Sequence, residues 1–153
     1  VAMNDIISHE HGLAQPAQGL ITLTHVVYGL HAFSALTGLA SAAFIVTAFL
    51  SGWPSILAVI LNYVKRGDVR GTFLASHFRW QIRTFWFALL WFVLLGVLAF
   101  LLVVVPAITV IGLPLAIGFG TLLFGVAMLV GLWVLYRIAR GWLALTSNAS
   151  MPA

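Results

Sequence analysis

Two long stretches without a charged side chain dominate the pattern of this chain. No Asp, Glu, Lys or Arg occurs between Glu10 and Lys65, or between Arg83 and Arg137. Each stretch is far longer than the ~20 apolar residues with which a helix crosses a bilayer. Each can therefore contain more than one membrane-embedded segment, and the pattern predicts an integral membrane protein.

The first apolar stretch predicts one long helix and one short helical segment. A first helix can run over about 20–50, where Ser51, Gly52 and Pro54 interrupt it. Proline is favoured in the first turn of a helix, so Pro54 should begin the next one. The apolar piece at 54–64 is too short for a standard crossing. We expect it to be a tilted helix completed by its flanks or a re-entrant element.

The second apolar stretch predicts two more helices. One begins near Phe73 and runs to about Val105, and Pro106 should end it. A corner rich in glycine and proline at 111–120 starts the last helix, which should stop near Gly141. The fold is therefore an all-α membrane protein, a bundle of four embedded helical segments of which the second is short or re-entrant.

The domain organisation follows from these four segments. Residues 20–145 form a single transmembrane domain that contains a basic loop at 62–83. A polar surface segment at 1–19 precedes it, and we expect 146–153 to be a flexible tail.

Composition supports this class of protein. Hydrophobic residues make up 63% of the chain and charged residues 7%, whereas soluble domains carry about a quarter charged residues. The sequence pI near 10.4 would point to nucleic acid in a soluble protein, but here the few cations are better read as topology signals and lipid contacts, so we expect no nucleic-acid partner. There is no cysteine, which excludes disulfides and thiolate chemistry.

The basic loop sets the expected orientation. It carries five of the seven basic residues, and we expect these to contact anionic lipid head groups or a partner: Lys65, Arg66, Arg70, Arg79 and Arg83. Short basic loops face the cytoplasm, so this loop and the C-terminus, with Arg137 and Arg140, should lie inside. The N-terminus is inside with four crossings and outside if 54–64 is re-entrant. Trp80 and Trp86 are candidate interfacial anchors.

Two polar stripes indicate how the first and third helices meet. His77, Gln81 and Thr84 recur at helical spacing on the third helix. The first helix offers His31 with the small residues Ser34 and Gly38, and small faces favour close packing in membranes. We expect the two stripes to pack together. The small-residue faces can close within one chain or between copies.

Candidate chemistry is sparse. His31 could be an axial ligand for haem or chlorophyll, but a hydrogen-bonded packing histidine explains it as well. No acidic residue lies in any predicted crossing, which argues against coupled transport. No hydrolytic triad, P-loop or carboxylate pair is present, so we expect neither an enzyme nor a metal site.

The run NYVKRGDVRGTFLASHFRWQIRTFWF from Asn62 to Phe87, together with YRIARGWLAL from Tyr136 to Leu145, resembles small proteobacterial inner-membrane proteins. These are related in layout to the DUF4870 family, which is described as Tic20-like. The specific part is His77 to Gln81, at the start of a helix. The resemblance implies a four-helix protein of the bacterial inner membrane with no known activity.

These observations favour a non-enzymatic interaction protein of the inner membrane. We expect an accessory or assembly subunit of a larger membrane complex that contacts anionic lipids or a partner through its basic loop. The alternative is a small homo-oligomeric channel or translocation component of the Tic20 kind. A haem- or pigment-binding subunit is the third reading.

Overall fold

The computed structural model describes residues 14–40 and 52–152, and all their regular structure is helical. The helices are α2 (Gln18–Ala40), α4 (Trp53–Lys65), α5 (Leu74–Ala99), η1 (Phe100–Val104), α6 (Val105–Ala107) and α7 (Leu113–Thr146). Three helical stretches are long and apolar enough to cross a membrane, namely α2, the continuous run from α5 to α6, and α7. The prediction of a helical membrane protein is confirmed at this level. Residues 1–13 and 41–50, parts of the expected N-terminal segment and first helix, lie outside the described residues.

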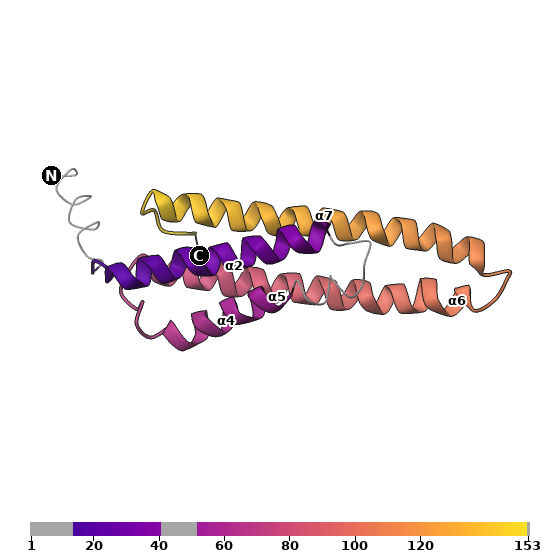
Figure 1. The fold of residues 1–153 in the computed structure, drawn as a ribbon, viewed down its shortest axis with the longest axis horizontal. Coiled ribbons are helices and arrows are strands. Elements are labelled where there is room, and N and C mark those ends of the chain that lie inside the picture. Colours follow the sequence, from indigo (N-terminus) through magenta and orange to yellow (C-terminus); the bar gives the residue numbers. More distant parts are fainter. Residues whose placement is uncertain (1–13, 41–51, 153) are drawn as a thin grey trace.

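The longest part of the molecule is an antiparallel helical hairpin (Figure 1). Its arms are the run from α5 to α6 and the helix α7, and 34 residues make each arm about 50 Å long. Trp80 donates a hydrogen bond to the carbonyl of Arg137 at one end (3.0 Å), and Val103 packs beside Gly120 toward the other. The arms are longer than the ~30 Å hydrocarbon core of a bilayer.

Helices α2 and α4 lie along only one half of this hairpin (Figure 1). α2 is antiparallel to α7, because Tyr28 faces Gly141 and Leu39 faces Gly131. The first turn of α4 meets the middle of α2, where His31 Nδ1 and Ser55 Oγ are 3.0 Å apart. With 13 residues α4 is about 20 Å long, as short as the sequence indicated.

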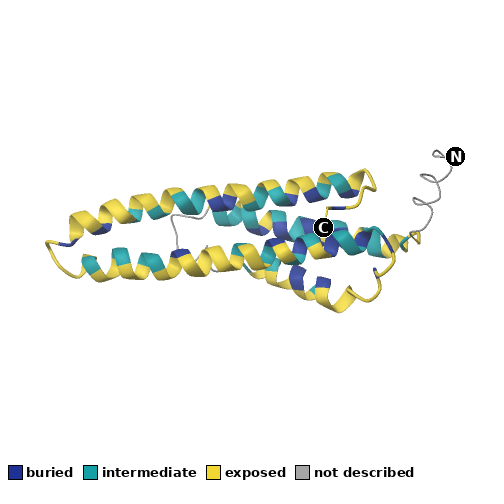
Figure 2. Ribbon diagram, turned by 180° about the vertical axis from the view of Figure 1, so that it is seen from behind, coloured by how far each residue is buried: buried dark blue, intermediate teal, exposed yellow. Residues whose placement is uncertain are grey.

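The packed core lies at the end of the hairpin that carries the basic loop. Its buried members come from α2, α5, α7 and the loop: Tyr28, Val69, Leu74, Phe78, Ile138 and Leu145. Along the half that α2 and α4 leave uncovered, most positions are exposed (Figure 2). Exposed apolar side chains in this half are what a lipid-facing surface requires.

The third helix ends close to where proline was expected to end it. Pro106 has no N–H to donate and crowds the turn before it. A π-helical turn, η1, precedes it, in which the Val105 N–H bonds the carbonyl of Phe100. The helix then continues one residue past Pro106, to Ala107.

The last helix begins within the expected corner but runs past its expected end. Most of the predicted corner at 111–120 is helical, because α7 begins at Leu113 with Pro114 in its first turn. The helix also continues past Gly141 to Thr146. Glycine is needed at 141 for close approach of Tyr28 and does not end the helix.

The basic loop is shorter than the expected 62–83. Its first residues belong to α4 and its last ten to α5, so the connection covers 66–73. Gly71 supplies a turn with φ of +76°, which favours glycine. Its carbonyl accepts the N–H of Ala14 (3.1 Å), which places the start of α2 at the same end of the molecule.

The C-terminal residues that we expected to be a flexible tail make specific contacts. After α7 the chain turns back toward the first turns of α5 (Figure 1). The carbonyl of Ala149 accepts a hydrogen bond from His77 Nε2 (2.8 Å), and the N–H of Met151 donates to Ser76 Oγ (2.9 Å). Met151 is buried.

The close approach of α2 to α7 can be tested at Gly141. A methyl group there would lie 2.5 Å from the hydroxyl oxygen of Tyr28 and 2.8 Å from its ring. Because Tyr28 is buried in the core, Gly141→Ala should lower the free energy of unfolding by about 1–3 kcal/mol. Unfolding in mixed detergent micelles, followed by circular dichroism, measures this.

The control is Gly125→Ala in the same helix, where a methyl group meets nothing within 4 Å. It should leave stability unchanged or raise it slightly, since alanine favours helix more than glycine. Equal effects of the two substitutions would contradict the packing of Tyr28 on Gly141.

Candidate functional site

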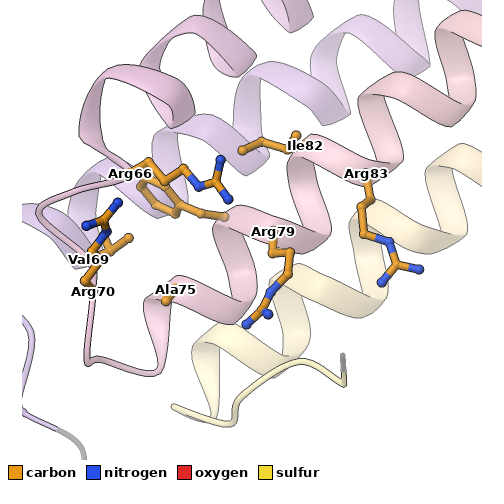
Figure 3. A pocket seen from close by; sticks show the side chains of 8 residues that line it. Arg66, Val69, Arg70, Ala75, Arg79, Ile82 and Arg83 are labelled. Atoms are coloured by element: carbon orange, nitrogen blue, oxygen red, sulfur yellow. The ribbon is translucent and has the colours of Figure 1, made fainter.

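A pocket lined by four arginines lies where the basic loop meets α5 (Figure 3). Its volume is about 390 Å³. We call it the arginine pocket, and its lining residues are Arg66, Val69, Arg70, Ala75, Phe78, Arg79, Ile82 and Arg83. Four of the five basic residues that the sequence singled out for contact with lipid or a partner thus line one hollow.

Local structure explains why these four arginines line the same pocket. Arg66 and Arg70 belong to the loop, and the buried side chain of Val69 anchors that loop in the core. Arg79 and Arg83 are four residues apart, on one face of α5. The other four lining residues, Val69, Ala75, Phe78 and Ile82, are apolar.

The charge of the pocket is not neutralised by the described part of the chain. Asp68 is the sole acidic residue within 14–40 and 52–152. It pairs with Lys65 at 2.9 Å, so Lys65, the fifth expected contact residue, is engaged elsewhere and does not line the pocket. The four pocket arginines are exposed. They place four positive charges next to the apolar lining residues.

Beside the pocket, His77 joins three parts of the chain. Its Nε2 bonds the carbonyl of Ala149, which can only accept, so Nε2 carries the proton. In the neutral ring Nδ1 then accepts from the hydroxyl of Tyr28 on α2, at 2.9 Å. The sequence missed Tyr28, although it lies one helical turn before His31.

The two polar stripes meet differently from the way expected. Tyr28 on α2 bonds His77 on α5. His31 instead bonds Ser55 on α4, and its ring lies 6.4 Å from the ring of Phe85 on α5. Ser34 is buried on the same side of α2 and Gly38 is half-buried. Protein atoms cover His31 Nε2, the atom that would bind a haem or chlorophyll metal. This favours the packing role of His31.

Thr84, the last member of the α5 stripe, contacts α7. Its Oγ1 accepts a hydrogen bond from Arg137 Nε (2.9 Å), and the Arg137 guanidinium stacks 3.8 Å from the ring centre of Trp80. Trp80, a candidate interfacial anchor, is half-buried and contacts α7 through Arg137. Trp86 is exposed and donates to the hydroxyl of Tyr63 (3.0 Å).

Two amides in the interior have no partner among the described residues. Asn62 on α4 is fully buried and Gln81 on α5 is 2% exposed, yet neither amide makes a hydrogen bond within 14–40 and 52–152. Buried polar groups are normally satisfied by protein or ordered water. Gln81, the middle member of the stripe, therefore contributes less to joining helices than His77 and Thr84.

Comparison with protein-family models, with curated proteins and with solved structures finds no match to this chain. The resemblance to the DUF4870 family therefore stays a prediction.

The junction at His77 can be tested by removing one hydroxyl group. Tyr28→Phe leaves His77 Nδ1 buried without a donor, which should lower the free energy of unfolding by about 0.5–2 kcal/mol. A double-mutant cycle with His77→Leu, measured by unfolding in detergent, should give a coupling of similar size.

The matched control is Tyr136→Phe, which removes the hydroxyl of an exposed tyrosine on α7. It should leave stability within about 0.5 kcal/mol of the original protein. A zero coupling energy between Tyr28 and His77 would refute the hydrogen bond.

Proposed function

We propose that this protein is a non-enzymatic, membrane-embedded accessory subunit that binds the head groups of anionic lipids in the arginine pocket. The observation that carries the proposal is the pocket itself, whose lining combines four apolar residues with four exposed arginines that form no ion pair within the described residues. Arginine binds phosphate through two parallel N–H···O contacts. Clusters of cations next to a membrane segment bind acidic lipids, at about 1 kcal/mol per residue.

The position of the pocket along α5 supports a lipid. Beyond Arg83, α5 continues without another charge, and its side chains Trp86, Phe87 and Leu90 are exposed. The pocket therefore lies at the boundary between the charged end of the hairpin and the surface suited to acyl chains. A head group can bind there while its chains stay along α5.

We propose that this end of the bundle faces the cytoplasm. The loop, the start of α2 and the C-terminal residues lie together, through the bonds of Gly71 with Ala14 and of His77 with Ala149. Arg137 also lies at this end, next to Thr84. Positive charge gathered at one end is typical of the cytoplasmic side of a bacterial inner membrane.

An accessory role fits the remaining features better than catalysis. The polar side chains of the described interior mainly join one helix to another: Tyr28 bonds His77, Ser55 bonds His31 and Arg137 bonds Thr84. The long hairpin offers a wide apolar surface to lipid or to a partner helix.

Lipid binding predicts a charge-specific loss on substitution. Arg79→Gln and Arg66→Gln should each weaken binding of phosphatidylglycerol by about fivefold, which corresponds to ~1 kcal/mol. Native mass spectrometry of the detergent-purified protein, titrated with phosphatidylglycerol and with zwitterionic phosphatidylcholine, measures the affinities. Lys65→Gln is the matched control and should have a smaller effect, because Lys65 pairs with Asp68 outside the pocket. Equal affinity for the two lipids would overturn the proposal.

The accessory role predicts a partner in a fixed ratio. Purification from native membranes in mild detergent, followed by mass spectrometry, should recover one membrane protein at constant stoichiometry. A homo-oligomer that conducts ions in liposomes would instead support the channel alternative.

A further inference from the structure

We infer that the turn of the hairpin is a lipid-contacting surface, which lies among the acyl chains of the far leaflet and does not emerge into the water beyond it. This turn, at 108–112, connects α6 to α7 at the end opposite the basic loop (Figure 1). Its partner is the hydrocarbon of the bilayer. The inference does not depend on the arginine pocket, so it goes beyond the proposed function.

The turn is apolar and almost fully exposed. The exposed fraction is 80% for Ile108 and 90% for both Val110 and Ile111. These fractions are higher than that of any other large hydrophobic side chain in the described part of the chain. Contact of three such side chains with water is unfavourable, whereas contact with acyl chains is not. The composition of the turn therefore suits hydrocarbon.

Aromatic residues mark only one head-group interface on the hairpin. Trp and Tyr gather at both interfaces of a typical spanning protein. Here the exposed Trp86, Trp91, Trp133 and Tyr136 lie toward the basic end. Between Trp91 and Trp133, a stretch that includes the turn, the sequence has no other Trp, no Tyr and no charged residue. The far end of the hairpin thus lacks the residues that favour a head-group region.

The length of the arms permits the turn to stay inside the bilayer. From Trp91 to the turn, and from the turn to Trp133, each arm is about 26–30 Å long at a rise of ~1.5 Å per residue. The hydrocarbon core is ~30 Å thick, and membrane helices are tilted by ~20° on average. With the aromatic residues at the near interface, the turn reaches the far leaflet without leaving it.

Hydrogen bonds within the turn fit an environment without water. Thr109 is its one polar side chain. The hydroxyl Oγ1 donates to the carbonyl of Pro106 (3.1 Å) and accepts from the N–H of Gly112 (3.0 Å). The N–H of Thr109 also donates to the Pro106 carbonyl, at 3.0 Å. In hydrocarbon, backbone groups must find their partners inside the protein. The hydroxyl of Thr109 serves the backbone of the turn in this way.

Single cysteines test where the turn lies, because the chain has no cysteine of its own. Val110→Cys places a thiol in the turn, and Gly67→Cys is the control in the exposed basic loop. The purified full chain, with a nitroxide spin label on either thiol, is reconstituted in vesicles of phosphatidylethanolamine and phosphatidylglycerol. Electron paramagnetic resonance then measures collisions with oxygen, which concentrates in hydrocarbon, and with a water-soluble nickel chelate present on both sides.

The label at 110 should collide with the nickel chelate at least about fivefold less often than the label at 67, because polar solutes are excluded from hydrocarbon. Its collisions with oxygen should be more frequent than those at 67. Equal access of the nickel chelate to the two labels would overturn the inference. That result would leave the lipid affinity of the arginine pocket, and so the proposed function, unaffected.

The hydroxyl of Thr109 offers a second test. Thr109→Val leaves the Gly112 N–H without this acceptor, and in hydrocarbon no water can replace it. The variant should lose folded chain on heating in the same vesicles at least about twofold faster than the original protein. Thr109→Ser keeps the acceptor and should match the original. Equal survival of the valine variant would show that water reaches the turn and would contradict the inference.

Discussion

The hydrogen bonds of His77 hold the basic end of the bundle together. Helices in lipid gain little from burying apolar surface against each other, so close packing and polar contacts decide how they associate. His77 makes two such contacts, one to Tyr28 on α2 and one to the residues after α7. The neutral ring can satisfy both because one nitrogen accepts while the other donates. Three separate parts of the chain are thereby joined at one side chain.

The two halves of the molecule differ in how tightly their helices pack, and His77 lies in the packed half. In the half near the loop, Tyr28 approaches Gly141 closely and the core residues are buried. In the other half, the hairpin has few buried positions and its apolar surface is open. The polar contacts between helices, including that of Arg137 with Thr84, lie in the first half. The contacts that fix how the helices pack therefore lie at the packed end, while the other end exposes its apolar side chains.

The arginine pocket depends on the same packed end. Val69 is buried in the core and positions the loop, which brings Arg66 and Arg70 beside α5. The register of α5, set by His77 and Trp80, in turn places Arg79 and Arg83 at the pocket wall. The gathering of four arginines at one pocket is thus a consequence of how the loop and helix pack.

The sequence by itself determined the class of fold and the position of the charges. Charge-free stretches far longer than a bilayer crossing leave no alternative to membrane-embedded helices. Local rules for proline predicted that the short second helix starts near Pro54 and that the third helix ends near Pro106. The basic cluster from Lys65 to Arg83 was equally evident, because so few other charges are present.

Tertiary structure alone decided which of these residues meet. Helical spacing placed His77, Gln81 and Thr84 on one stripe, but it could not assign His77 to Tyr28 or Thr84 to Arg137, nor show that Gln81 has no partner in the described part of the chain. Lys65 does not line the arginine pocket, and its ammonium group pairs with Asp68 instead. A spacing pattern defines a face of one helix, whereas partners depend on the relative height and rotation of two helices. Those are set by contacts between residues far apart in the chain.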